Sequence, residues 1–200
     1  MNAIIGFSES LLTEDLPENQ KNEVQSIYDA ASTLLEIINN ILDVSRIESG
    51  KEEKREKTYD IRKVIMQLTS VITAKVDQNK VNFTVNIDKD VPKFLISDEL
   101  KIYQILMNLL SNAVKFTNNN GNIFVLMDAN NEYVTIRIKD DGVGVSEEVR
   151  EEIFKRFVQE DKSFNRKKEG SGIGLALVKS LVELHDGQVY LEKGIQKGSE

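Results

Sequence analysis

Two amides and one ammonium share a face of a predicted helix near the middle of the chain. Over residues 102–117, six apolar residues recur at the three-and-four spacing of a helix that packs on a core: Ile102, Ile105, Leu106, Leu109, Leu110 and Ala113. Asn108, Asn112 and Lys115 interrupt that pattern and form a second stripe, because residues three and four apart are neighbours on a helix. This stripe suits a metal–phosphate group, although a solvated polar face would have the same composition.

A glycine-containing acidic segment follows a predicted strand at residues 133–139. Asp140 to Gly144 read D-D-G-V-G. A carboxylate fixed at a strand end can accept a hydrogen bond from an exocyclic amine such as that of adenine, and Gly142 and Gly144 let the backbone approach a ligand. Asp and Gly also form ordinary turns, so this motif alone is weak evidence for a nucleotide site.

A second glycine segment opens a helix predicted over residues 172–185. Gly170, Gly172 and Gly174 lie just before and within its first turn, where backbone N–H groups and the positive end of the helix dipole attract phosphate. The G-x-G-x-G spacing matches neither the dinucleotide fingerprint nor the P-loop. A merely flexible loop remains an alternative.

A basic connector lies between these two glycine segments. Residues 155–168 carry six cations against Glu160 and Asp161, a net of +4 in an acidic protein. Phe154 and Phe157 can anchor the start of the connector, and the following polar residues are expected to move. We therefore predict a lid that contacts a polyanion.

Composition limits the classes of function. The chain has 200 residues, 40% of them hydrophobic, and a net charge of −7, which argues against non-specific binding to nucleic acid or anionic membranes. It has no cysteine and a single histidine, His185, so a disulfide scaffold, a thiolate site and a histidine metal cluster are excluded. No apolar run reaches the roughly 18 residues of a membrane span and no signal pattern follows Met1, so a cytoplasmic setting is expected.

The first 50 residues are predicted to form an antiparallel helical hairpin. Residues 2–14 and 18–49 both have helical periodicity, and the turn between them contains Pro17. The helices would be about 20 and 48 Å long, which leaves much of the second helix's apolar seam uncovered. We infer that the first helix is truncated at its N-terminal side. Two copies would cover the seam by forming a four-helix bundle, so a homodimer is predicted.

The rest of the chain predicts an α/β sandwich. The charged segment 51–57 is predicted to be a linker, and residues 58–200 a second domain. Helical periodicity covers residues 61–76, whereas residues 81–87, 122–127, 133–139 and 188–193 are predicted strands. The fold class is α+β, with a mixed sheet covered by helices on one face. The chain ends at Glu200, where another hairpin begins, which predicts a C-terminal truncation.

The order of these segments resembles that of bacterial sensor histidine kinases over nearly the whole chain. "NLLSNAVKFT" is similar to the family's N box and "DDGVG" to its first glycine box. "IFKRFVQED" resembles the F box and "GSGIGLAL" the second glycine box. "MNAIIGFSESLL" and "ILDVSRIESGK" resemble the start and the end of the dimerisation hairpin.

The resemblance implies a role for each matching residue, with ATP and Mg²⁺ as cofactors. It makes Asn112 the Mg²⁺ ligand and Asn108 its companion at the phosphates, and Asp140 the residue that reads adenine. Lys115 and Arg166 would contact phosphate. The glycines that would line the nucleotide are Gly142, Gly144, Gly170, Gly172 and Gly174. A response-regulator receiver domain is the implied partner.

The largest departure from the family is at the front, where the phosphoacceptor motif H-E-x-R-T-P is absent. His185, in "ELHDG", is expected to end or pack a helix instead. The predicted function is the kinase core of a two-component phosphorelay, which transfers phosphate to a histidine that these residues lack. The alternatives are an ATPase of the gyrase and heat-shock chaperone type, for which the Asn108 amide is a poor general base, and a nucleotide-sensing dimer module.

Overall fold

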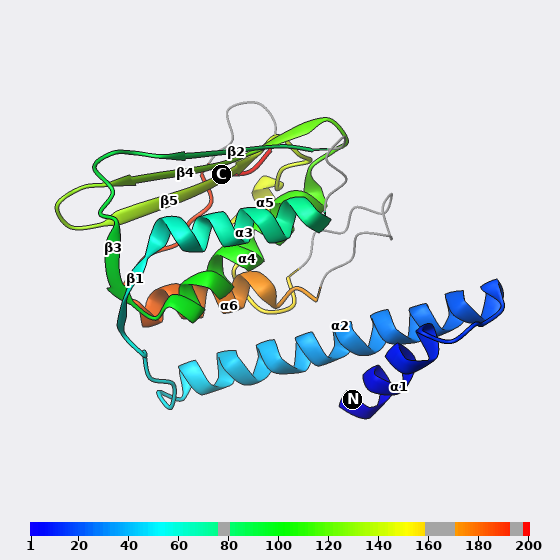
Figure 1. The fold of residues 1–200 in the computed structure, drawn as a ribbon. Helices are drawn as coiled ribbons and strands as arrows, with labels where there is room; N and C mark the ends of the chain where they lie inside the picture. The colour runs from blue at the N-terminus through cyan, green and yellow to red at the C-terminus, as the bar shows by residue number, and fades with distance from the viewer. Residues whose placement is uncertain (76–80, 159–170, 193–197) are drawn as a thin grey trace.

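The computed structural model describes residues 1–75, 81–158, 171–192 and 198–200. A helical hairpin lies beneath a layered α/β body, and the long second helix runs along the underside of that body (Figure 1). Among the described residues, no helix combines the length and the apolar composition needed to cross a membrane.

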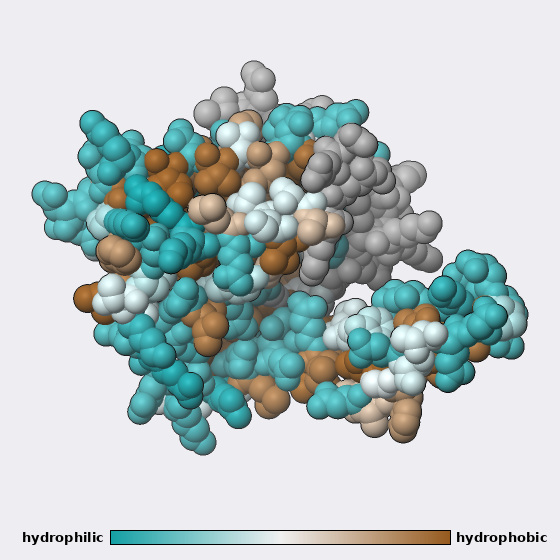
Figure 2. Space-filling view, viewed as in Figure 1, coloured by the Kyte–Doolittle hydropathy of each residue, from teal (hydrophilic) through white to brown (hydrophobic). Residues whose placement is uncertain are grey.

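The hairpin consists of α1 (Asn2–Leu12) and α2 (Glu18–Glu48), which confirms both predicted helices to within a few residues. Pro17 is the N-cap of α2, and Gly50 follows its end with φ +64°. As predicted, much of the apolar seam is uncovered: the exposed residues include Ile27, Leu34, Ile38 and Ile41 of α2 and Ile4, Phe7 and Leu11 of α1. Apolar surface is accordingly visible along this part of the molecule in Figure 2.

The central sheet has the strand order β2–β4–β5 and is mixed, as predicted. β2 (Val81–Ile87) runs parallel to β4 (Gly121–Ala129), and β4 runs antiparallel to β5 (Val134–Asp140). Alternate residues of β4 point into the core, where Ile123, Val125 and Met127 are buried. A second, two-stranded sheet pairs β1 (Lys57–Asp60) with β3 (Phe94–Ser97).

Helices α3 (Ile61–Lys75) and α4 (Glu99–Phe116) cover one face of the central sheet (Figure 1). A further helix, α6 (Gly174–Leu184), packs on α4 and α2, and a short helix, α5 (Glu147–Arg150), follows β5. Leu68 of α3 and Leu106 and Leu110 of α4 pack with Ile123 and Val125 of β4 in the main core. The α+β sandwich with helices on one face is thus confirmed.

The predicted strand at residues 188–193 is wrong over the residues that the structure describes. Residues 188–192 have no strand assignment, and Lys193 lies outside the described residues. Among the described residues, one backbone bond links this segment to another extended one: Glu192 N–H donates to Glu200 O. A short apolar run such as Val189 to Leu191 becomes a strand only where a neighbouring strand supplies a ladder. The segment 51–57, predicted as a linker, is irregular up to Lys57, the first residue of β1.

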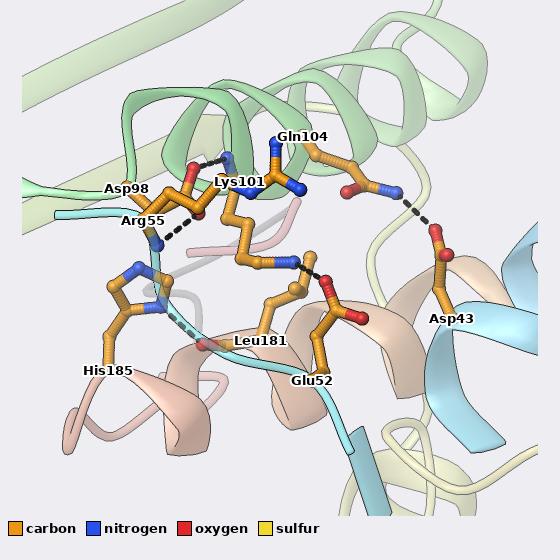
Figure 3. Close-up of polar contacts among 8 residues, drawn as sticks. All are labelled: Asp43, Glu52, Arg55, Asp98, Lys101, Gln104, Leu181 and His185. Atoms are coloured by element: carbon orange, nitrogen blue, oxygen red, sulfur yellow. Dashed lines mark hydrogen bonds and ion pairs between the residues drawn. The ribbon is translucent and has the colours of Figure 1, made fainter. Parts of the chain in front are cut away.

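A second core joins the hairpin to the α/β body. Val44 near the end of α2 is 1% exposed and packs with Ile105 of α4 and with Leu177 and Leu181 of α6. Polar contacts lie around this apolar contact, and Figure 3 shows the two described next. Lys101 Nζ lies 2.6 Å from Glu52 Oε1, and the Arg55 backbone N–H donates to Asp98 Oδ2 at 2.9 Å. The end of α2 and the segment after it are therefore fastened to α4 and α6.

Candidate functional site

Helix α4 is fixed at its N-terminus by Asp98, the N-cap residue. Asp98 Oδ1 accepts the Lys101 backbone N–H at 3.3 Å, and the side chain is only 5% exposed. Burial would raise the pKa of this carboxyl, but hydrogen bonds from the backbone N–H groups of Arg55 and Lys101 outweigh it and hold the pKa below its usual value. The charged cap and the buried apolar face together determine which face α4 turns to the site.

The amide stripe lies beside this buried face. Asn108 and Asn112 are half-buried, and Asn108 Nδ2 donates to Gln104 O at 3.0 Å. That bond leaves the amide oxygen of Asn108 facing the start of α6, since a Cβ added at Gly174 would lie 2.8 Å from Asn108 Oδ1. Lys115, in the last turn of α4, has its Nζ 5.2 Å from the centre of the Phe116 ring.

The acidic glycine segment packs directly against the end of α4. Asp140, the last residue of β5, is 6% exposed, and its Oδ1 accepts the Gly142 N–H at 2.9 Å. Burial raises the pKa of the Asp140 carboxyl and the charge of Asp141 adds to this, while hydrogen bonds from Gly142 and Ser199 act in the opposite direction. A Cβ at Gly142 would lie 2.3 Å from Phe116 O, so only glycine fits there.

The second glycine segment leads into α6. Gly172 has φ +67°, and a Cβ there would approach Phe157 Cα to 3.0 Å. Phe157 itself holds the segment through its backbone, because its N–H donates to Gly172 O at 2.8 Å while its side chain is 68% exposed. The expectation that both phenylalanine side chains anchor this region thus holds for the half-buried Phe154 alone. Helix α6 begins at Gly174, and no side chain among the described residues caps it, so its first N–H groups are suited to an anion.

One cavity of about 1600 Å³ brings most of the predicted site residues together. From the described part of the chain, Asn108, Asn112, Lys115, Asp140, Gly144, Gly172 and Gly174 all line it. Gly142 is buried behind the lining, where it shapes the loop. Arg166, Gly170 and the predicted lid lie outside the described residues.

Sequence reasoning missed the contribution of α2 to this cavity. Thr33, Glu36, Ile37 and Asn40 of the hairpin also line it. These residues lie at helical spacing on α2, beside the apolar seam that is predicted to pack against a second copy of the chain. The signal in the sequence is Asn40 itself, a polar residue at helical spacing between Ile37 and Val44, and the structure leaves it only 8% exposed.

His185 ends α6, as expected. It is the C-cap residue of that helix, and its Nδ1 donates to Leu181 O at 2.7 Å (Figure 3). Among the described residues, its buried Nε2 has no hydrogen-bond partner. The described residues contain no cluster of three or more carboxylate, histidine or cysteine groups that could hold a metal by themselves. A metal ion at this site would have to be held by side-chain amide oxygens and by oxygens of a ligand that is bound together with it.

The arrangement matches that of known proteins. Residues 97–200 match the family described as histidine kinase-, DNA gyrase B-, and HSP90-like ATPase, and residues 1–50 match the His Kinase A (phospho-acceptor) domain. The chain belongs to the ATPase family and, with the His Kinase A domain in front, it is the ATP-binding kinase core of a sensor histidine kinase.

Individual relatives agree with this assignment. The chain is 34% identical to the circadian input-output histidine kinase CikA of Synechococcus elongatus and 32% identical to the histidine-protein kinase BarA of Escherichia coli, over 100% of its length in each case. It spans 27% and 22% of those proteins. Its structure is similar to that of full-length ShkA in complex with AMPPNP, with TM-score 0.82 and 26% identity over 99% of this chain and 41% of ShkA. For histidine kinase ThkA in complex with the response regulator TrrA, the TM-score is 0.70 at 22% identity over 98% of this chain and 54% of that one, a likeness of fold.

Proposed function

We propose that this kinase core binds ATP with Mg²⁺ and transfers the γ-phosphate to a histidine of a phosphoacceptor helix. The observation that carries the proposal is the single cavity in which the amide stripe of α4 lies with Asp140, the glycine loop and the open N-terminus of α6. A phosphoryl donor needs positioning and charge neutralisation more than covalent chemistry, and amides, a lysine and a helix N-terminus supply both. The AMPPNP bound to ShkA supports an adenine nucleotide as the ligand.

The residues present fit a Mg²⁺–nucleotide pair. Mg²⁺ keeps several waters and takes few protein oxygens, so the half-buried Asn112 amide, with Asn108 beside it, is a sufficient donor set. Bound there, the ion would neutralise charge on the phosphates. Lys115, and Arg166 by resemblance, would contact the phosphates, and the Asp140 carboxylate would accept a hydrogen bond from the adenine amino group.

We further propose that the core works in the cytoplasm as a homodimer. It would pass the phosphoryl group on to a response-regulator receiver domain. The exposed apolar residues of α1 and α2 support self-association. The complex of ThkA with a response regulator supports the second partner. The net charge of −7 disfavours nucleic acid as a further partner.

Nucleotide titration of the purified protein tests the proposal. The wild-type protein should bind ATP more tightly than GTP. Asp140→Asn should weaken ATP binding by about 1–3 kcal/mol, because an acceptor oxygen becomes a donor, and it should remove most of the preference for ATP. If Asp140→Asn kept the wild-type ratio of ATP to GTP affinity, Asp140 would not read adenine. Phosphate release should be slow, since steady turnover would favour the gyrase-type ATPase alternative.

A further inference from the structure

Beside the candidate adenine reader stands a second carboxylate that does not line the cavity. Asp141 follows β5, and successive residues of an extended chain point to opposite sides. Asp140 is therefore turned into the cavity, whereas Asp141 is half-buried outside its lining. A role for Asp141 in nucleotide binding would thus act through another residue.

Asp141 is tied to Asn122, near the start of β4, by three hydrogen bonds. Its Oδ1 accepts the Asn122 backbone N–H at 2.7 Å, and its Oδ2 accepts the Asn122 side-chain amide at 2.6 Å. Its own N–H donates to Asn122 O at 3.2 Å. The ladder between β4 and β5 ends one residue earlier, at Ile123 and Asp140, so this clamp extends the pairing with a side chain. Hydrogen bonding by Asn122 holds the pKa of Asp141 below its usual value, and the carboxylate is ionised at neutral pH.

The surroundings are built tightly around this clamp. A Cβ at Gly121 would lie 2.6 Å from Asp141 Oδ1 and 2.4 Å from Thr117 Cγ2, so glycine makes room for the carboxylate. On the other side, Asn82 of β2 donates its amide to Asn122 Oδ1 at 3.2 Å. The clamp therefore connects the ends of all three strands of the central sheet.

The same loop also contacts the amide helix. The Val143 N–H donates to Phe116 O at 3.3 Å, and Gly142 is in close contact with that carbonyl. Asp141 therefore holds a loop that has Asp140 on one side and the last turn of α4, with Lys115, on the other. A shift of this loop would move the two halves of the site relative to each other.

We propose that Asp141 is a positioning residue, which holds the Asp140 loop through Asn122 and so sets how strongly the site prefers adenine to guanine nucleotides. This inference rests on the proposed role of Asp140. Loss of the clamp should loosen the carboxylate that reads the base without removing it. The preference for ATP should then fall while binding through the phosphates persists.

The test compares ATP and GTP affinities in two single variants and one exchange. Asp141→Asn weakens the clamp, because an amide N–H replaces the Oδ2 acceptor of the Asn122 side chain, and a flip of the Asn122 amide to meet it would break its bond from Asn82. Asn122→Ala removes the same side-chain bond and keeps the charge of Asp141, while both bonds to the Asn122 backbone remain. Each should lower the ratio of ATP to GTP affinity by about 3- to 10-fold. The double variant Asn122→Asp with Asp141→Asn reverses donor and acceptor and should restore the ratio. Asp90→Asn, an exposed carboxylate in the turn after β2, is the matched control and should change nothing.

The outcomes distinguish the positioning role of Asp141 from the proposed role of Asp140 in reading adenine. If Asp140→Asn removes the preference while Asp141→Asn and Asn122→Ala keep it, the positioning role is wrong and the adenine role stands. If Asp140→Asn also keeps the preference, the adenine role itself is wrong. An equal loss of ATP and GTP affinity in both single variants, with no rescue in the double variant, would show that the clamp serves folding alone.

Discussion

Gln104 of α4 donates a hydrogen bond from its side-chain amide to Asp43 Oδ2 of α2, at 3.1 Å (Figure 3). Gln104 lies one helical turn before Asn108 and also accepts that residue's side-chain amide on its backbone carbonyl. Asp43 precedes Val44, the apolar centre of the contact between the hairpin and the α/β body. The amide helix is therefore bound to the hairpin at the turn next to its candidate phosphate-binding residues.

Val44→Asp should separate the hairpin from the α/β body. A charge at a position that is 1% exposed has no partner among the apolar residues around it, Ile105, Leu177 and Leu181, so the contact should open. Small-angle scattering should show a larger radius of gyration, and trypsin should cut faster at Lys51 to Arg55. The α/β body should still melt cooperatively, because its main core is separate.

Ala30→Asp is the control for this variant, because Ala30 is exposed on the same helix. It should leave both the radius of gyration and the digestion rate unchanged. An unchanged radius of gyration for Val44→Asp would mean that the polar contacts alone hold the two parts together.

Asn112→Ala should remove the Mg²⁺-dependent part of ATP binding. Mg²⁺ takes so few protein oxygens that the loss of one is not compensated by neighbours. Titration of a fluorescent ATP analogue with and without Mg²⁺ measures the effect. Asn119→Ala, an exposed asparagine just beyond α4, should behave as wild type. If the ATP affinity of the two variants depended equally on Mg²⁺, the assignment of Asn112 as the Mg²⁺ ligand would be wrong.

Asp140→Asn should raise the stability of the nucleotide-free protein at neutral pH. Because the folded-state pKa of Asp140 is raised, the folded protein favours the protonated form, and its free energy of unfolding falls as the pH rises from below the unfolded pKa of about 3.9 to above the folded one. Asparagine removes that penalty. Thermal melts should therefore show a higher Tm for the variant at pH 7, with the difference shrinking toward pH 3. A lower Tm at pH 7 would contradict the sign.

Incubation with labelled Mg²⁺-ATP should give no acid-labile, alkali-stable phosphate on these 200 residues. Transfer needs an imidazole in line with the γ-phosphate, and the only histidine, His185, has its Nδ1 bound to Leu181 O and its Nε2 buried. A longer first helix that carries H-E-x-R-T-P should restore labelling. Label recovered on His185, and lost in His185→Gln, would overturn this view.

Periodic segments with a buried face were predictable from the sequence, and short strands were not. Helices α2 and α4 and strand β2 have an apolar pattern that runs long enough to define its period, and β2 matches its predicted range residue for residue. Strands β1 and β3 have four residues each, too few for a pattern, and each depends on a partner more than thirty residues away. The segment 188–192, wrongly predicted as a strand, has a short apolar run, and none of the described strands pairs with it.

The candidate site was predicted from its motifs, and the contact between its parts was not. Asn108, Asn112 and Asp140 were found because polar residues interrupt an apolar pattern or end a strand. The approach of Thr33 and Asn40 to the same cavity depends on the docking of Val44 onto α6, a contact between elements about 130 residues apart. No local pattern encodes such a contact. The Asp141 clamp was missed because its partner, Asn122, lies on another strand.

Helix α2 is continuous over 31 residues, and among the described residues its apolar contact with the α/β body is made near its C-terminal end, by Val44 and Ile47. From Val44 back to Glu18 it extends about 39 Å, so a rotation of about 10° at the Val44 contact would sweep the far end through about 7 Å. The helix can thus act as a lever that pivots beside the candidate nucleotide cavity. A large movement of the N-terminal end of α2 would therefore be transmitted to Gln104 and the amide stripe as a much smaller movement.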